Sequence, residues 1–216
     1  TATKFNDFYE AGHEICKNLS GVPLFLKIIE LCPIADLEIE NMLIKLRKLL
    51  LLKRQTFLNS SKLLPFQKSL ALNCFTNEYI FEETKEETRE VDKLLKQLKQ
   101  ASTSGSQISP SQIACLGSYR PLHLFSWTKK FKSLSGLEDL FNRQVKEFKK
   151  ELILRKSIPQ LKPIRKKVSQ SVQEQYENNP YPRWINTRLT KKPLSMIQLA
   201  SLLEFDLNET EISFSE

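Results

Sequence analysis

The sequence predicts an all-α fold, an irregular multi-helix bundle with an extended Pro-rich segment near the C-terminus. Apolar residues recur at spacings of three and four along most of the chain, and residues suited to capping precede several of these runs. No segment shows the strict alternation of a confident strand. With 216 residues, 40% of them hydrophobic, the chain is long enough for one large core or two small ones.

We assign residues 1–100 to a helical bundle. Residues 36 to 54 carry a wide apolar stripe that is typical of a helix central to a bundle: Ile39, Met42, Leu43, Leu46, Leu49 and Leu50. A second run, Leu64 to Phe81, places a proline near its first turn and apolar side chains around much of its circumference, which predicts a largely buried helix. Thr84 and Glu87 fit a capping box that opens a third helix, because hydroxyl and carboxylate satisfy donors that the first turn leaves unpaired.

Residues 101–110 are small and polar, and we expect a flexible linker or loop there. Residues 111–168 should continue the helical structure on the same core. Ser109 and Gln112 form a box that opens a helix of about two turns, and a longer helix is expected from about Leu137 to Arg155.

The last region, 169–216, combines two predicted capping boxes with an extended stretch. Ser171 with Glu174 should open a short helix that runs to about Tyr176, and Ser195 with Gln198 should open the last helix. Between them, the Asn-Pro-Tyr-Pro sequence at 179–182 must be extended, because each proline pushes its predecessor out of the helical region.

Several classes of function are disfavoured by composition. The five glycines are isolated, so they form no phosphate-binding loop. The four cysteines are far apart and lack metal-ligand spacing, so we expect buried, reduced thiols and no metal. No apolar run approaches the ~18 residues of a membrane span, and no secretory signal is recognisable, so we expect a cytoplasmic protein without a membrane partner.

The net charge of +8 is unevenly distributed along the chain. Residues 120–192 contain eighteen Lys or Arg and six Asp or Glu, a net +12, whereas the rest of the chain carries a net −4. This basic segment could form a solvated face, or it could attract nucleic acid, an acidic partner or a phosphorylated substrate. Both interpretations remain open from the sequence.

Two short stretches contain side chains suited to chemistry. His123, which follows Arg120 closely, could act as a general base because imidazole titrates near neutral pH, but it has no partner at a recognisable spacing and could equally be structural. Asn77, Glu78 and Tyr79 lie on the predicted buried helix, where a glutamate must be paired or neutralised. They predict either a structural hydrogen-bond network or a ligand contact.

The least common local feature is the segment Gln175 to Trp184. Its two prolines fix the backbone, so Tyr181, Arg183 and Trp184 are presented in a set order at little entropic cost. Arginine and aromatic residues are frequent interface anchors. The segment could pack across the helices of its own domain, or it could dock onto a neighbouring domain or ligand.

The sequence Val-Gln-Glu-Gln-Tyr-Glu-Asn-Asn-Pro-Tyr-Pro-Arg-Trp at 172–184 resembles the segment just upstream of the catalytic domain in a family of bacterial class I S-adenosylmethionine-dependent methyltransferase-like proteins, many of which carry tetratricopeptide repeats. Residues 71–79 and 119–123, with Arg143-Gln144 and Ile158-Pro159, also resemble that family, and together they extend the resemblance from about residue 37 to 205. Gln173 and Asn178 depart from it, since Arg and Glu are expected there.

The resemblance implies that the cofactor-binding strand and its Gly-rich loop would follow Glu216. No catalytic, cofactor-binding or metal-binding residue is therefore carried over, and S-adenosylmethionine is expected only for an intact family member. The candidate contacts to substrate or to a neighbouring domain are Tyr176, Glu177, Asn179, Tyr181, Arg183 and Trp184, followed by Asn77, Glu78, Tyr79, Arg120 and His123.

The leading hypothesis is a non-catalytic helical region that precedes a methyltransferase domain, in cis or in trans, and helps to recognise the methyl acceptor or to close the site. The alternative is a helical interaction or nucleic-acid-binding module that uses the basic segment 120–192. A self-contained enzyme is the third hypothesis, and the missing phosphate loop disfavours it.

Overall fold

The computed structural model describes residues 2–58, 60–131, 134–159 and 167–178, together with the single positions 194, 195, 198 and 201. Every regular element in these residues is helical, which confirms the predicted all-α class. The chain divides into two compact units, Thr1–Arg183 and Trp184–Glu216. The bundle described next belongs to the first unit.

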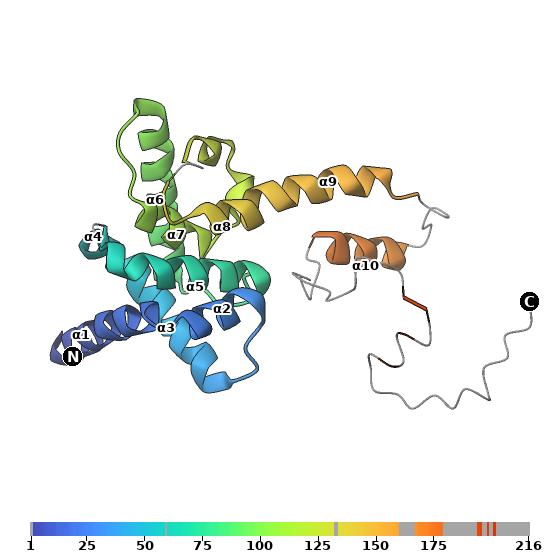
Figure 1. Ribbon diagram of the computed structural model, residues 1–216. Coiled ribbons are helices and arrows are strands. Elements are labelled where there is room, and N and C mark those ends of the chain that lie inside the picture. Colours follow the sequence, from blue (N-terminus) through green and yellow to red (C-terminus); the bar gives the residue numbers. More distant parts are fainter. Residues whose placement is uncertain are drawn as a thin grey trace, which may run out of the picture. The chain divides into compact units, whose positions relative to one another are not determined.

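The first part of the bundle consists of five α-helices and one short 3-10 turn. They are α1 (Ala2–Ser20), α2 (Pro23–Leu31), α3 (Leu37–Leu52), α4 (Arg54–Phe57), the turn Ser61–Leu63 and α5 (Leu64–Thr76). Asp36 caps α3, since its carboxylate accepts from the backbone N–H groups of Glu38 and Ile39. Figure 1 shows these helices in blue to green.

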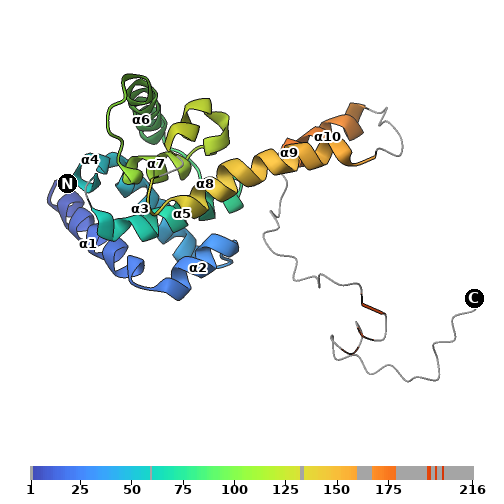
Figure 2. The same ribbon diagram turned by 45° about the horizontal axis from the view of Figure 1, so that its top comes forward.

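Helix α5 lies at the centre of the bundle, between α2 and α7 (Pro110–Gly117), as Figures 1 and 2 show. On one side it contributes Phe66 and Leu70 to a core shared with α1 to α4. On the other it contributes Ala71 and Leu72 to a core shared with α6 and α7. The predicted burial of this helix is confirmed, and its position between two cores explains why it is apolar around its circumference.

Helix α5 ends at Thr76, five residues before the predicted end. Tyr79 N–H donates to the Cys74 carbonyl at 2.8 Å, and Glu78 and Tyr79 take the left-handed conformation with φ of 51° and 56°. A reversal of this kind ends a helix by satisfying its last carbonyls. Ile80, predicted on the buried helix, is consequently 74% exposed.

Helix α6 (Lys85–Ser104) begins at the predicted capping box, since the Glu87 side chain accepts from Thr84 N–H at 2.9 Å and Thr84 Oγ1 accepts from Glu87 N–H at 3.3 Å. The flexible linker predicted at 101–110 is wrong in part. Residues 101–104 form the last turn of α6, and Ile108 is buried in the core beside α7. Ile108 and the partly buried Ala101 thus anchor a segment whose composition is otherwise polar.

Two glycines with positive φ provide a matched test of backbone strain. Gly105 ends α6 at φ +73° with open space around a Cβ, whereas a Cβ at Gly136 (φ +84°) would lie 2.9 Å from Leu64 Cδ2. We expect Gly105→Ala to lower the free energy of unfolding by about 1 kcal/mol, the cost of the left-handed conformation. Gly136→Ala should cost slightly more, because the end of the Leu64 side chain must also shift to make room for the Cβ. Urea denaturation of both variants measures the two losses, and a smaller loss for Gly136→Ala than for Gly105→Ala would contradict the packing described at Gly136.

Helix α7 begins at the second predicted capping box, in which Gln112 Oε1 accepts from Ser109 N–H at 3.1 Å. Two 3-10 turns follow, Leu122–Leu124 and Ser126–Phe131. The helix predicted for about 137 to 155 is present over Glu138–Ser157, in three parts: α8 (Glu138–Phe141), a π-helical segment (Asn142–Glu147) and α9 (Phe148–Ser157). Both ribbon views draw α8 and α9 as one continuous helix.

Helix α10 (Lys167–Asn178) begins four residues earlier than predicted, so Ser171 lies inside the helix and is not its cap. The box predicted at the last helix is confirmed within its own unit. Ser195 N–H donates to Gln198 Oε1 at 3.0 Å, and Gln198 N–H donates to Ser195 Oγ at 3.2 Å.

Candidate functional site

Two of the predicted site residues, Tyr79 and His123, meet at Phe75 near the C-terminal ends of α5 and α7. Phe75 makes edge contacts with Tyr79 and with His123, at centroid distances of 6.4 and 6.5 Å. The Tyr79 hydroxyl donates to the Gly117 carbonyl at 3.1 Å. The two stretches that carry the family resemblance, 71–79 and 119–123, are therefore neighbours in the fold.

Two contacts fix the position of the His123 imidazole. Its ring stacks on Phe148 with a centroid distance of 3.5 Å, and its Nδ1 lies 3.1 Å from the Gln144 carbonyl oxygen. Because a carbonyl can only accept, Nδ1 carries the hydrogen in this contact. The imidazole thereby links the 122–124 turn to the start of α9, which favours the structural alternative for this residue.

Arg120 forms a two-point ion pair with Glu83, in which Nη2 lies 3.0 Å from Oε2 and Nη1 contacts Oε1. Nη1 also donates to the Tyr119 carbonyl at 2.7 Å. The hydrogen bond that Arg120 donates to Glu83 raises the pKa of Arg120 above its usual value, against the opposing effect of burial. The arginine is thus neutralised by a partner thirty-seven residues away in the sequence.

Asn77 and Glu78 do not lie on a buried helix, which corrects their predicted setting. Asn77 follows the last residue of α5, and its amide nitrogen lies 3.3 Å from Asn73 Oδ1. Asn77 Oδ1 is buried and accepts no hydrogen bond from the described residues. Glu78 is half-buried in the left-handed turn, so the cost of burying a helical carboxylate does not arise.

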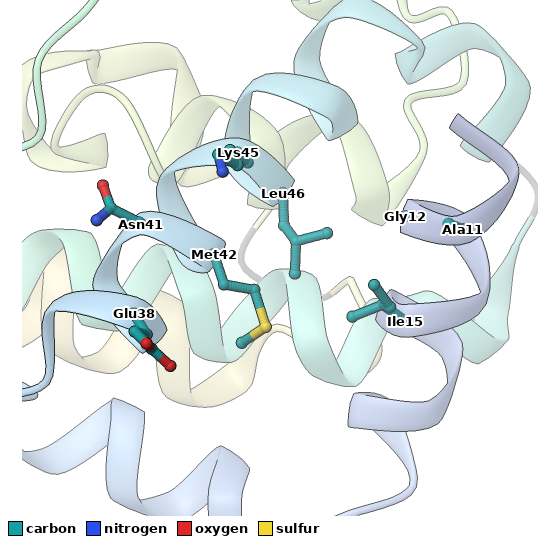
Figure 3. A pocket seen from close by; sticks show the side chains of 8 residues that line it. All are labelled: Ala11, Gly12, Ile15, Glu38, Asn41, Met42, Lys45 and Leu46. Atoms are coloured by element: carbon teal, nitrogen blue, oxygen red, sulfur yellow. The ribbon is translucent and has the colours of Figure 1, made fainter. Parts of the chain in front are cut away.

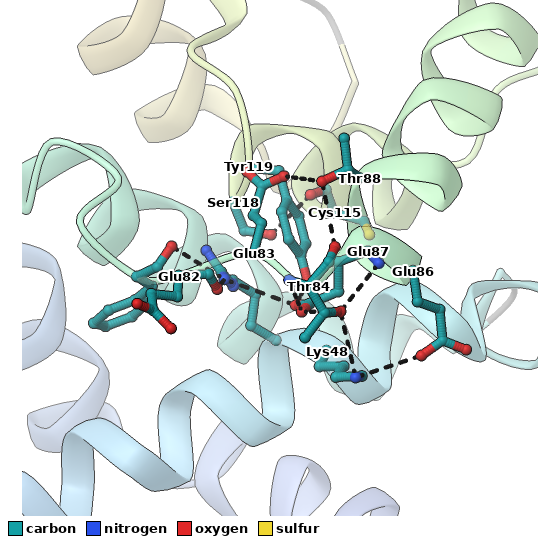
Figure 4. Close-up of polar contacts among 12 residues, drawn as sticks. Lys48, Glu82, Glu83, Thr84, Glu86, Glu87, Thr88, Cys115, Ser118 and Tyr119 are labelled. Atoms are coloured by element: carbon teal, nitrogen blue, oxygen red, sulfur yellow. Dashed lines mark hydrogen bonds and ion pairs between the residues drawn. The ribbon is translucent and has the colours of Figure 1, made fainter.

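A buried charged cluster, Arg47–Glu87–Tyr119, was not predicted from the sequence. Arg47 is 1% exposed, its guanidinium lies 4.3 Å from the centroid of the Tyr119 ring, and its Nη2 donates to the Glu82 carbonyl at 2.7 Å. Glu87 Oε1 lies 3.7 Å from the same Nη2 and accepts from the Tyr119 hydroxyl at 2.8 Å. Figure 4 shows Glu87 between Thr84 and Tyr119.

The surroundings of this cluster set its ionisation. Burial raises the pKa of Glu87, but hydrogen bonds from Thr84 and Tyr119 and the charge of Arg47 outweigh it, so the pKa is lowered overall. Burial raises the pKa of Tyr119 far above its usual value. The cluster is therefore a fixed Arg–carboxylate pair with a neutral phenol, and it joins α3, α6 and the segment that follows α7.

A second unpredicted feature is a polar contact region that joins α2, α5 and the π-helical segment. Arg143 donates to the Glu30 carbonyl and, at 2.7 Å, to Thr76 Oγ1. Asn73 Nδ2 donates to the Ile29 carbonyl at 2.9 Å, and Ser69 Oγ donates to Glu30 Oε1 at 2.7 Å. A polar row at 69, 73 and 76 in an otherwise apolar run is the signal that could have revealed it.

Gln144 is fully buried, and its side chain links three parts of the bundle. Its amide nitrogen donates to the carbonyls of Ala71 at 3.1 Å and Gly117 at 3.0 Å, while its Oε1 accepts from Leu122 N–H at 3.1 Å. The Arg143-Gln144 pair of the resemblance therefore has structural contacts on both residues.

The remaining predicted contacts are only partly described by the structure. Tyr176 lies on α10 and is 65% exposed, and Glu177 belongs to the same helix. Asn179, Tyr181, Arg183 and Trp184 lie outside the described residues.

A hollow with a volume of about 390 Å³ lies elsewhere, between α1 and α3. Its lining is mixed: Ala11, Gly12, Ile15, Glu38, Asn41, Met42, Lys45 and Leu46 (Figure 3). None of the predicted site residues that the structure describes lines it.

Within the described residues, no group of three or more His, Cys, Asp or Glu side chains is placed to hold a metal ion, and no helix is both long and apolar enough to span a bilayer. Cys16, Cys74 and Cys115 are buried thiols as predicted, whereas Cys32 is exposed. Comparison of the chain with protein-family models, curated proteins and solved structures finds no match.

Proposed function

We propose that this chain is a non-catalytic helical region that works beside an S-adenosylmethionine-dependent methyltransferase domain, in the cytoplasm, and contributes to recognition of the methyl acceptor or to closure of its site. The proposal rests on the resemblance of residues 172–184 and on one structural observation, the exposed apolar residues of α9. The contacts around His123 support the non-catalytic part of the proposal. Arg120, Tyr79 and His123 Nδ1 all form hydrogen bonds to groups within the bundle, which is typical of structural side chains.

The observation that carries the proposal is that α9 buries no residue. Ile153 is 70% exposed and Ile158, at its C-terminal cap, is 67% exposed, and Leu152 and Leu154 are also exposed. Folded domains seldom leave neighbouring large apolar residues in water unless a partner covers them. Because α9 lies shortly before residues 172–184, which resemble the methyltransferase-like family, we propose the catalytic domain as the partner.

The first test is the coding sequence that follows Glu216. The proposal in its cis form predicts a strand followed by a Gly-rich loop with the Gly-x-Gly pattern of class I methyltransferases. A downstream frame without these features would contradict the cis form.

The second test is association between the chain and that methyltransferase domain, produced as a separate polypeptide. We expect Ile153→Ser with Ile158→Ser to weaken binding about tenfold or more, because truncating buried apolar anchors commonly costs over ~1 kcal/mol each. Calorimetry measures the dissociation constants of the variant and the parent.

The matched control replaces two apolar residues that are equally exposed but lie elsewhere on the bundle. Leu24 is 73% and Ile80 is 74% exposed, so Leu24→Ser with Ile80→Ser removes the same kind of surface. The proposal predicts unchanged affinity for this control. Equal weakening by both pairs would show that α9 is not the contact.

A further inference from the structure

The sequence from Lys93 to Leu137 contains seven Lys or Arg residues and no Asp or Glu. Two of the seven are neutralised, Lys93 by Glu90 at 2.7 Å and Arg120 by Glu83. The lysines at 96, 99, 129 and 130 are exposed. An acid-free stretch with exposed cations creates a local positive field that attracts anions.

Contacts between α6 and the 126–131 turn bring these cations to one surface. Lys130 Nζ donates to the Ser102 carbonyl near the end of α6 at 2.9 Å. Leu95 of α6 and Trp127 of the turn pack against the same core cluster. Lys99 lies one helical turn after Leu95, so it shares the side of α6 that meets the turn.

Aromatic rings accompany the lysines on the turn. Trp127 stacks on Phe125 with a centroid distance of 5.5 Å and an interplanar angle of 23°, and Phe131 meets the same indole edge-on at 6.1 Å. All three rings are only half-buried, and Leu124 beside them is 62% exposed. Accessible aromatic rings beside cations are the features with which proteins bind unpaired bases and their phosphates.

We propose that the C-terminal half of α6 and the 126–131 turn form a binding surface for single-stranded nucleic acid. Lys99, Lys129 and Lys130 contact phosphates, and a base stacks on the accessible part of Trp127. This surface differs from the basic segment 120–192 considered from the sequence, because it includes α6 and excludes the paired Arg120. It also does not depend on the methyltransferase partner, which is assigned to α9.

Single strands fit this surface better than the other anionic partners. In a duplex the bases are already stacked on one another, so a partly accessible aromatic ring has no unpaired base to receive. An acidic lipid surface binds helices with a broad apolar face, whereas the rings here are anchored in the core by their buried sides.

The test is fluorescence anisotropy with a labelled oligouridylate of about 20 nucleotides, over a range of salt concentrations. Lys99→Glu with Lys129→Glu should weaken binding at least about tenfold and reduce the salt slope by ~1.4, which corresponds to two lost phosphate contacts on a single strand. The matched control, Lys45→Glu with Lys62→Glu, makes the same change in net charge at exposed lysines on α3 and the 61–63 turn. It should weaken binding less than about threefold.

A stacking readout separates base binding from simple charge attraction. The two tryptophans of the chain are Trp127 and Trp184, so a Trp184→Phe variant reports Trp127 alone. Oligouridylate should quench this emission, and inorganic polyphosphate should not. The proposal is overturned if polyphosphate quenches equally, if both lysine pairs weaken binding equally, or if phosphatidylserine vesicles bind in a Lys99- and Lys129-dependent manner while oligouridylate does not bind.

Discussion

Replacing Glu87 with glutamine is expected to lower the free energy of unfolding by about 3 kcal/mol, because it leaves the charge of Arg47 buried without its counter-charge. The side chain of Glu87 is 3% exposed and that of Arg47 is 1% exposed, so water cannot replace the lost partner. Glutamine keeps the shape of the side chain, which limits the change to charge and hydrogen bonding. Urea denaturation followed by circular dichroism near neutral pH measures the loss.

The neighbouring Glu86 provides the control. Its side chain is 62% exposed and pairs with Lys48 at 3.4 Å on the surface. Glu86→Gln should therefore change the free energy of unfolding by less than ~0.5 kcal/mol, as is usual for exposed pairs. Similar losses in the two variants would contradict the buried pair.

The same cluster predicts how stability depends on pH. The pKa of Glu87 is lowered in the folded protein, so its contribution is present above the unfolded value of about 4.3 and is lost as the pH falls through the folded value. The parent should therefore lose more stability than Glu87→Gln on acidification below about pH 4, and the two denaturation midpoints should converge. Parallel curves over this range would contradict the assignment.

Replacing Gln144 with alanine is the second change with a large expected effect, a loss of about 3 kcal/mol. The variant removes both the donor to the Ala71 and Gly117 carbonyls and the acceptor of the Leu122 N–H, and it opens a cavity where three segments meet. Thermal and urea denaturation both measure this loss.

Two further variants separate the causes of that loss. Gln144→Leu fills most of the space but leaves the Leu122 N–H without its acceptor, so it should still cost at least about 1 kcal/mol. Gln97, exposed on α6, is the control, and Gln97→Ala should change stability by less than ~0.5 kcal/mol. A neutral Gln144→Leu would mean that the hydrogen bonds contribute nothing net.

Local features were predictable from the sequence because their causes are local. The capping boxes at Thr84, Ser109 and Ser195 each depend on a residue three positions later, and all three are present. The burial of α5 followed from its apolar circumference, but the central position expected for residues 36–54 is occupied by α5. Helix α2 was not assigned, although Pro23 in its first turn is a recognised helix-start signal.

Features that depend on distant partners could not be predicted. Arg47 lies within the apolar stripe of α3. Its burial is stabilised by Glu87 and Tyr119, which lie far along the chain. The end of α5 depends on a left-handed turn that Tyr79 secures through the Gly117 carbonyl. For the same reason the sequence did not predict that Tyr79 and His123 meet at Phe75. The family resemblance includes both stretches but does not place them together.

The proposal that this region is not the catalytic part is tested most directly by calorimetric titration of the chain alone with S-adenosylmethionine. We expect no heat beyond that of dilution, because the proposed function places the cofactor site in a separate methyltransferase domain. A dissociation constant of micromolar order, about −8 kcal/mol of binding free energy, would show that the chain contains a cofactor site of its own and would contradict the proposed function.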